Sequence, residues 1–267
     1  MGGRRNAIMG AALIAAALLF SAGDANAIIE GHPSGLHAHM VRVDSGASHC
    51  SGVAIGRQAV VTAAHCAGRP SVNADGQRIA VSHVTRSAVV DGRRVSVAGD
   101  AAILMLREPL PGSISPLPIG DPGGGEYTVA GFGTATEAQR MAIGTLREAR
   151  LVEAARFALV DPNRTGNIGA SACYGDSGGA VLRGGMLVGI ITRASHPHPR
   201  IACGYLTRWA PVSASGAPVA VAAFPSANAY PDSPYAAPFA VAAAEKTAVR
   251  KAKKGKRKKF RKKRRRG

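Results

Sequence analysis

The sequence predicts an all-β domain, and three features of its middle section carry that prediction. Short apolar stretches alternate with frequent turns that are rich in glycine. Two of these turns, Asp75-Gly76 and Asp91-Gly92, have the composition of tight β-hairpin turns, and apolar alternation follows each of them. Helical periodicity is largely absent through this half of the chain. Short strands with closely spaced turns indicate a barrel or a sandwich.

Further strand pairs are expected where apolar runs flank short polar turns. Such hairpins are predicted around Gly56-Arg57-Gln58 and around Arg183-Gly184-Gly185. Residues 116–125 are rich in proline and glycine, and they suit a connection between two halves of the domain. Residues 137–157 are more charged and are compatible with either a hairpin or a short helix.

Residues 1–27 have the layout of a cleavable signal peptide. Two arginines precede a short apolar run, and Ala25-Asn26-Ala27 forms an A-x-A cleavage site before Ile28. A membrane-spanning anchor is the alternative, but the apolar run is short and rich in alanine. We therefore expect a protein that is secreted, periplasmic or associated with the cell envelope, with a folded domain from residue 28 to residue 210.

The net charge of +18 over 267 residues is concentrated at the C-terminal end. Residues 246–267 contain fifteen of the 34 Lys and Arg residues and no acidic residue, so the preceding domain is nearly neutral. Residues 211–245 are rich in alanine and proline and predict an extended linker, because proline interrupts a continuous helix. The basic tail is expected to be disordered alone and to bind a polyanion: nucleic acid, anionic lipid or an acidic envelope polymer.

One seven-residue stretch, Cys173-Tyr174-Gly175-Asp176-Ser177-Gly178-Gly179, carries the strongest indication of chemistry. A serine hydroxyl becomes an effective nucleophile when a base takes its proton and donors stabilise the resulting oxyanion. Gly175 and Ser177 can direct two backbone N–H groups at one point, because glycine permits the sharp turn that this requires. For this motif alone, a glycine-rich turn without chemistry is the alternative.

A second motif, Thr62-Ala63-Ala64-His65-Cys66, favours the catalytic interpretation. Together the two motifs resemble those of the trypsin/chymotrypsin family of serine proteases, over residues 28 to 210. The order of histidine, aspartate and serine along the chain is also that of the family. Asp100 precedes an apolar run that resembles the family's D-I-A-L-L strand and is the expected aspartate, with Asp91 as the less favoured substitute. The resemblance implies two antiparallel six-stranded β-barrels, a chymotrypsin-like fold, with the triad between them.

The resemblance also assigns a role to each member of the site. Ser177 would attack the substrate carbonyl, His65 would carry the proton, and Asp100 would orient His65. The N–H groups of Gly175 and Ser177 would form the oxyanion hole. No metal and no organic cofactor are implied.

The mature N-terminus and the cysteines have expected roles as well. By resemblance, the amine of Ile28, freed by signal cleavage, would pair with the carboxylate of Asp176 and shape the oxyanion hole. Four cysteines in an exported chain fit two disulfides, whereas zinc binding is disfavoured because no C-x-x-C pair is present. The resemblance pairs Cys50 with Cys66 and Cys173 with Cys203.

The expected substrate-binding residues lie around the serine motif and on the strand at 189–194. By resemblance, Ser171 lies at the base of the primary specificity pocket, where trypsin-like members carry an aspartate. Without a carboxylate there, we expect cleavage after apolar residues and no preference for Arg or Lys. Arg193 replaces the usual tryptophan of the strand against which substrates pair. The expected set is Ser171, Ala172, Tyr174, Thr192, Arg193, Ala194 and Gly204.

These observations predict an exported serine endopeptidase that acts as a monomer on protein or peptide substrates and has no transmembrane anchor. Two alternatives belong to other functional classes. A non-catalytic binding protein could use the same fold, but such proteins usually lose a triad member and this sequence loses none. A cationic effector could instead act on envelopes or polyanions through the tail, with the protease domain as its carrier.

Overall fold

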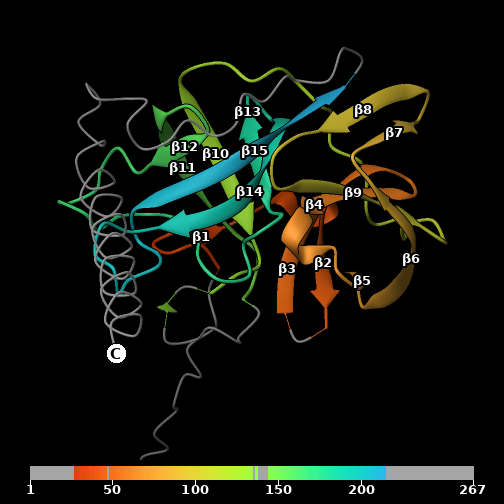
Figure 1. Ribbon diagram of the computed structural model, residues 1–267, viewed down its shortest axis with the longest axis horizontal. Helices are drawn as coiled ribbons and strands as arrows, with labels where there is room; N and C mark the ends of the chain where they lie inside the picture. Colours follow the sequence, from red (N-terminus) through yellow and green to blue (C-terminus); the bar gives the residue numbers. More distant parts are fainter. Residues whose placement is uncertain (1–26, 47, 135, 138–143, 215–267) are drawn as a thin grey trace, which may run out of the picture.

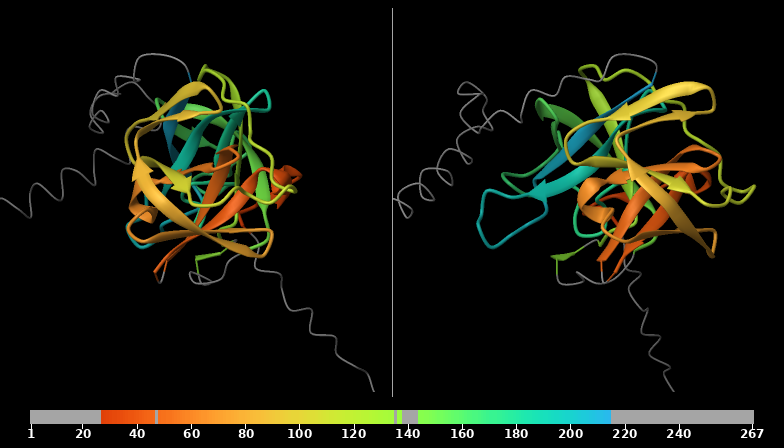
Figure 2. Two further views of the ribbon diagram at one scale, coloured as in Figure 1. Left: turned by 90° about the vertical axis from the view of Figure 1, so that its right-hand side faces the viewer. Right: turned by 45° about the vertical axis from the view of Figure 1, so that its right-hand side comes forward.

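A computed structural model describes residues 27–46, 48–134, 136–137 and 144–214. Within these residues the chain forms two closed, six-stranded antiparallel β-barrels (Figure 1). The barrels lie against each other, which two further views of the ribbon also show (Figure 2). The predicted all-β, chymotrypsin-like architecture is therefore confirmed.

The first barrel is built from the N-terminal half of the described chain. Its strands follow one another around the barrel as β2 (Met40–Ser45), β3 (Ser48–Gly56), β4 (Ala59–Ala63), β9 (Ala101–Leu106), β6 (Gln77–Thr85) and β5 (Pro70–Ala74). The valines Val53, Val60 and Val61 of its central hairpin are fully buried. Burial of such β-branched side chains favours the strand conformation, because they pack well on a pleated surface.

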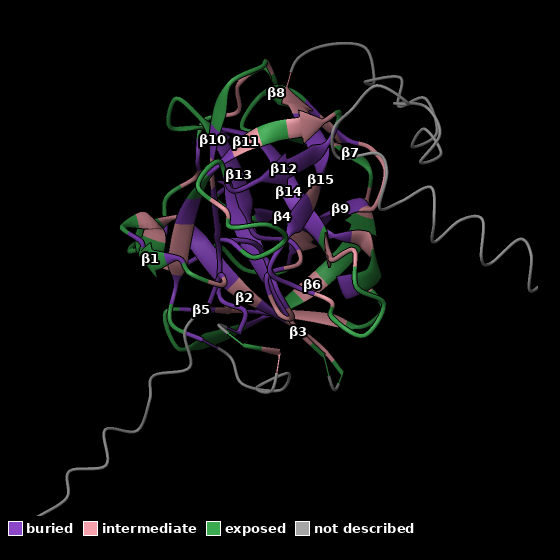
Figure 3. Cartoon of the chain, turned by 90° about the vertical axis from the view of Figure 1, so that its left-hand side faces the viewer, coloured by how far each residue is buried: buried purple, intermediate pink, exposed green. Residues whose placement is uncertain are grey.

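The second barrel contains a single tryptophan in its core. Its strands are β10 (Glu126–Gly131), β11 (Arg147–Ala155), β12 (Ala158–Val160), β15 (Leu206–Ala214), β14 (Met186–Ser195) and β13 (Ala180–Arg183), and β13 pairs back with β10. The ring of Trp209 is buried, with Tyr127 at 5.7 Å and Phe157 edge-on at 5.0 Å between ring centroids. In Figure 3 the buried residues follow the strands of both barrels, and the exposed residues gather in the loops and outer edges.

Smaller elements complete the fold. Strand β1 (His32–Pro33) pairs with β11, and the hairpin of β7 (Ser87–Val90) and β8 (Arg93–Val97) pairs with the end of β15. Two short 3₁₀ helices, η1 (Leu36–Ala38) and η2 (Ala64–Cys66), follow β1 and β4. Among the described residues, no helix is long and apolar enough to cross a membrane.

The predicted hairpin turns are confirmed. Asp75-Gly76 joins β5 to β6, and both residues have positive φ angles of 50° and 78°. Asp91-Gly92 joins β7 to β8 with angles of 48° and 78°. Positive φ at both central residues fits the twist of the flanking strands, which is why Asp-Gly is favoured there. Within residues 137–157, whose sequence is compatible with either a hairpin or a short helix, Arg147–Ala155 is a strand that pairs with both β10 and β12, and residues 138–143 lie outside the described residues.

Strand β15 runs to Ala214, past the domain end expected at residue 210. Pro211 does not end the strand, and Val212 beyond it is fully buried and pairs with Val97 of β8. The expected signal peptide up to residue 26, and the linker and tail from residue 215, lie outside the described residues.

Candidate active site

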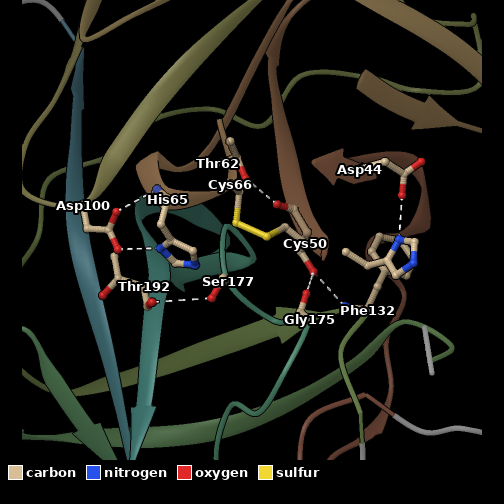
Figure 4. The surroundings of a disulfide bond; sticks show 12 residues. Asp44, Cys50, Thr62, His65, Cys66, Asp100, Phe132, Gly175, Ser177 and Thr192 are labelled. Carbon is tan, nitrogen blue, oxygen red and sulfur yellow. Dashed lines mark hydrogen bonds and ion pairs between the residues drawn. A yellow bond between two sulfur atoms is a disulfide. The ribbon is translucent and has the colours of Figure 1, made fainter. Parts of the chain in front are cut away.

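Pairing of β4 with β9 brings His65 and Asp100 together. Ala63 at the end of β4 lies opposite Ala101 at the start of β9, so the residues just beyond these ends are neighbours. The Nδ1 atom of His65 is 2.7 Å from Oδ2 of Asp100, and the backbone N–H of His65 donates to Oδ1 at 3.0 Å (Figure 4). When Nδ1–H donates a hydrogen bond to the carboxylate, the neutral ring carries its one hydrogen on Nδ1. Nε2 then carries no hydrogen and can act as a base. Asp91, the substitute considered above, lies in the β7–β8 turn.

Ser177 belongs to the serine loop, residues 173–179, which leads into β13. Ser51 of β3 fixes this loop to the first barrel, because its N–H donates to the carbonyl of Ser177 at 2.8 Å. The Ser51 hydroxyl donates to the carbonyl of Gly175 at 2.9 Å and accepts the N–H of Phe132 at 2.9 Å (Figure 4). The position of the serine loop is therefore set by both barrels.

Two N–H groups of the serine loop, those of Gly175 and Ser177, have no hydrogen-bond acceptor among the residues that the structure describes. In contrast, the N–H of Asp176 donates to Cys173 and that of Gly178 to a carbonyl of β14. Gly175 has a φ of +88°, and a Cβ there would come within 2.9 Å of the Cα of Gly133. Only glycine fits this position. Two backbone N–H groups without acceptors, next to a serine hydroxyl, are suited to stabilise an oxyanion by hydrogen bonds.

Asp176 is fully buried beneath the serine loop. Its carboxylate accepts the N–H groups of Gly133 and Cys173, each at 2.8 Å, and the backbone N–H of Ile28 lies near enough to lower its pKa. Burial raises the pKa of Asp176 from 3.8 to about 7, against the opposing effect of these three donors. Ile28 is itself buried, and the effect of its N–H on the pKa of Asp176 indicates that the two residues are neighbours.

His65, Asp100 and Ser177 open onto one cleft of about 560 Å³. The Ser177 hydroxyl lies 3.5 Å from the carbonyl oxygen of Thr192 on β14 (Figure 4). Four of the expected substrate-binding residues line this cleft together with the three catalytic candidates: Tyr174, Thr192, Arg193 and Ala194.

The other three expected substrate-binding residues lie behind the wall of the cleft. Ser171, Ala172 and Gly204 are buried and do not line it. The Ser171 hydroxyl donates to the carbonyl of Ala172 at 3.0 Å and accepts the N–H of Gly204 at 2.7 Å. Its hydrogen-bonding capacity is therefore largely used inside the protein.

Both predicted disulfides are present, which confirms the expected pairing. Cys50–Cys66 joins β3 to η2, and Cys173–Cys203 joins the serine loop to the segment before β15. They close loops with sequence separations of 16 and 30 residues, and each contributes about 3–4 kcal/mol in the chain-entropy model. Each disulfide therefore holds one side of the cleft, one beside His65 and the other beside Ser177.

Sequence reasoning missed two features of the cleft. Oε1 of Glu137 accepts the N–H groups of Ala202 and Cys203, the latter at 2.6 Å, and so holds a segment of the cleft wall. Nothing in the sequence relates these distant residues. Asp44 and His49 face each other across the β2–β3 hairpin, with 2.8 Å between Oδ1 and Nδ1. Recognition of that hairpin would have predicted this pair, because directly opposite residues on antiparallel strands share a face.

The two-barrel fold, with histidine, aspartate and serine on a cleft where the barrels meet, defines a chymotrypsin-like serine protease. The Trypsin family model matches residues 28–213, and the chain belongs to this family of serine endopeptidases. Among solved structures it is similar to neuropsin, a serine protease expressed in the limbic system of mouse brain. That likeness has 23% sequence identity and a TM-score of 0.50 and covers 68% of this chain and 94% of the other. A search of curated protein sequences finds no match.

Proposed function

We propose that this chain hydrolyses peptide bonds through Ser177, His65 and Asp100. The observation that carries the proposal is the 2.7 Å contact between His65 Nδ1 and Asp100 Oδ2, on the same cleft as Ser177. This contact leaves Nε2 as the proton acceptor of the histidine. A non-catalytic binding role has no comparable support, because all three residue types are retained with their side chains on one cleft.

The reaction begins when the Ser177 hydroxyl turns from Thr192 toward His65 Nε2, loses its proton and attacks the substrate carbonyl carbon. The carbonyl oxygen becomes an oxyanion and accepts the N–H groups of Gly175 and Ser177. His65 then donates the proton to the leaving amine, and the C–N bond breaks to give an acyl-enzyme. Water adds to the ester with His65 again as base, which releases the carboxylate product and restores Ser177.

Activation by signal cleavage is the second part of the proposal. In the uncleaved chain, Ile28 has a φ of +52°, a region that β-branched residues rarely adopt. Cleavage after Ala27 removes this strain, because an N-terminal residue has no preceding carbonyl carbon and hence no such constraint. It also creates an ammonium group at the Ile28 nitrogen, whose N–H in the uncleaved chain lies near enough to the Asp176 carboxyl group to lower its pKa. Ionisation of Asp176 would then be compensated, and the serine loop would be held in its active form.

Specificity for apolar residues is the third part. Position 171 carries serine where a carboxylate would be needed for Arg or Lys, and the Ser171 hydroxyl is already bonded to Ala172 and Gly204. A basic substrate side chain would lose its hydration without gaining a charged partner. We expect cleavage after medium or large apolar residues.

Export and tethering complete the proposal. The N-terminal segment sends the chain to an oxidising compartment, which the two disulfides fit. The tail at 246–267 then holds the enzyme on an anionic surface, and the linker that follows β15, from residue 215 to residue 245, lets the protease domain work at a distance from it.

Covalent labelling tests the catalytic proposal. A fluorophosphonate probe should label the mature protein, and Ser177→Ala should abolish labelling while the protein stays folded by circular dichroism. Turnover of a peptide substrate should fall by about 10⁴–10⁶, because the three residues act as a unit. Equal labelling of wild type and variant would refute the assignment of Ser177.

A further inference from the structure

Strand β14 has an unpaired edge where it passes the active site. β13 pairs with β14 from Met186 to Ile190, whereas β15 pairs with it up to Ser195. Among the described residues, no strand therefore pairs with the β13 side of β14 beyond residue 191. Thr192, Arg193 and Ala194 of this edge line the cleft with Ser177. An extended peptide can add to such an edge as a further antiparallel strand.

The position of Ser177 sets the register of that added strand. Its hydroxyl lies 3.5 Å from the carbonyl of Thr192, so the substrate residue that becomes acylated is placed beside Thr192. The residue before it in the substrate then lies opposite Arg193. Side chains alternate between the two faces of a strand, so the second and fourth residues before the scissile bond share the face of Arg193.

Arg193 brings an uncompensated positive charge to this face. It is exposed, it lines the cleft, and none of the three ion pairs within the described residues includes it. It also lies directly opposite Arg208 on β15. Like charges at directly opposite positions are destabilising in a sheet. The pKa of Arg208 is lowered, first by burial and then by the charge of Arg193, which indicates that the two guanidinium groups repel each other.

A carboxylate from a bound peptide would relieve this repulsion. A guanidinium group offers a planar set of donors that matches the geometry of a carboxylate. A basic substrate residue at the same place would add a third cation. A cation at this place would discriminate between substrates by charge, at a position separate from the pocket for the residue at the scissile bond.

We propose that Arg193 forms a subsite for an acidic side chain, Glu or Asp, at the second or fourth residue before the scissile bond. This inference rests on the proposed peptidase activity of Ser177 and names a substrate class for it. The preferred substrates are peptides with an acidic residue shortly before an apolar cleavage residue.

Matched peptides test the proposal. Three peptides share one sequence and carry Glu, Gln or Lys at the second position, and three more carry them at the fourth. With wild-type enzyme, kcat/KM should be about two- to fivefold higher for Glu than for Gln in at least one of the two sets, and lowest for Lys, the size expected for a partly exposed ion pair. Arg193→Gln should remove the Glu/Gln ratio in that set, and Arg193→Glu should invert the order of Glu and Lys.

Arg94→Gln is the matched control. Arg94 is an exposed arginine of β8 that does not line the cleft, so its loss lowers the net charge equally and should leave the Glu/Gln ratio unchanged. Affinities of the same peptides for the Ser177→Ala variant, measured by titration calorimetry, give a readout that needs no turnover. A Glu/Gln ratio of one in wild type, or a ratio that survives Arg193→Gln, overturns the subsite. Absence of cleavage of any peptide would instead refute the peptidase proposal, while the affinity ratio still decides on the subsite.

Discussion

Asp176 links the chemistry of one buried carboxyl group to the proposed cleavage of the chain after Ala27. Its side chain is inaccessible to solvent, and its pKa of about 7 means that ionisation is costly in the uncleaved protein. The backbone N–H of Ile28 already lies near enough to lower this pKa, so cleavage after Ala27 would place an ammonium group there without a large movement. A buried carboxylate with a directly bonded cation is far less costly than one without.

The pH dependence of stability tests this link. In the uncleaved chain the folded pKa of Asp176, about 7, exceeds the value of 3.8 in the unfolded chain. The folded state then binds more protons between these values, so the free energy of unfolding should fall as the pH rises, by about 2–3 kcal/mol from pH 5 to pH 8. In a chain that begins at Ile28, the ammonium should lower the pKa of Asp176 and remove most of this fall.

The measurement is urea unfolding of both forms at the two pH values, with Ser177→Ala in each to prevent self-cleavage. Groups other than Asp176 titrate in both forms and contribute equally to the decrease in the free energy of unfolding. The difference in this decrease between the two forms therefore isolates the contribution of the N-terminus. Identical pH dependence in the two forms would contradict the pairing of Ile28 with Asp176.

At the scale of elements, the site depends on one strand of the first barrel holding a loop of the second. Ser51 on β3 contacts the serine loop through its N–H and its hydroxyl, and the hydroxyl also accepts the N–H of Phe132. Ser51 is fully buried, so these groups cannot exchange one partner for water. The N–H groups of Gly175 and Ser177, the proposed oxyanion donors, are held by this contact as well as by the local turn.

Ser51→Ala should therefore weaken catalysis and stability together. Loss of the hydroxyl leaves the Gly175 carbonyl and the Phe132 N–H without this partner, which should cost about 1–3 kcal/mol in urea unfolding. We expect kcat to fall at least tenfold with a smaller change in KM, because the oxyanion donors matter most in the transition state. Ser82→Ala on β6 is the control: its hydroxyl also donates to a strand carbonyl but is exposed, so both quantities should stay near wild type. A Ser51→Ala enzyme with unchanged kcat would show that the serine loop needs no support from β3.

The elements that sequence alone predicted are those specified locally. The Asp-Gly hairpins and the serine loop depend on backbone angles that only a few residue types adopt, and these residues are visible in the sequence. The disulfide pairing and the His65–Asp100 contact followed from the family resemblance and agree with the structure. The anchoring by Ser51 and the contact of Glu137 with the cleft wall join residues far apart in the chain. These contacts form only when both barrels have folded, so no local sequence pattern predicts them.

For the whole molecule, the separation of charge between domain and tail constrains what the enzyme can cut. Every lysine of the chain lies in residues 246–267, and the domain carries arginine alone as its basic residue apart from histidine. A protease that preferred Lys or Arg would destroy its own tail. In the proposed specificity, the serine at position 171 and the positive charge of Arg193 would both disfavour basic substrates, which is compatible with an intact tail.

Salt-dependent retention on a polyanion tests the proposed role of the tail. Fifteen cations within residues 246–267 should displace counterions from any dense anionic surface, whether lipid, nucleic acid or acidic polymer, and the attraction should weaken as salt rises. The domain between the signal segment and the tail is nearly neutral and adds little to this attraction. The full mature chain should bind heparin and anionic vesicles at low salt, and its affinity should fall by orders of magnitude as salt rises from about 50 mM to 200 mM.

The matched comparison is a chain that ends at Glu245 and keeps the protease domain and the linker. It should elute from heparin at low salt and show the same turnover of a small peptide as the full chain, because the tail is far from the cleft in sequence and is not required for chemistry. The full chain should cleave substrates displayed on anionic vesicles faster than the truncated chain, and high salt should abolish that advantage. Equally tight binding by the truncated chain, or binding that salt does not weaken, would exclude an electrostatic tether and assign retention to the domain itself.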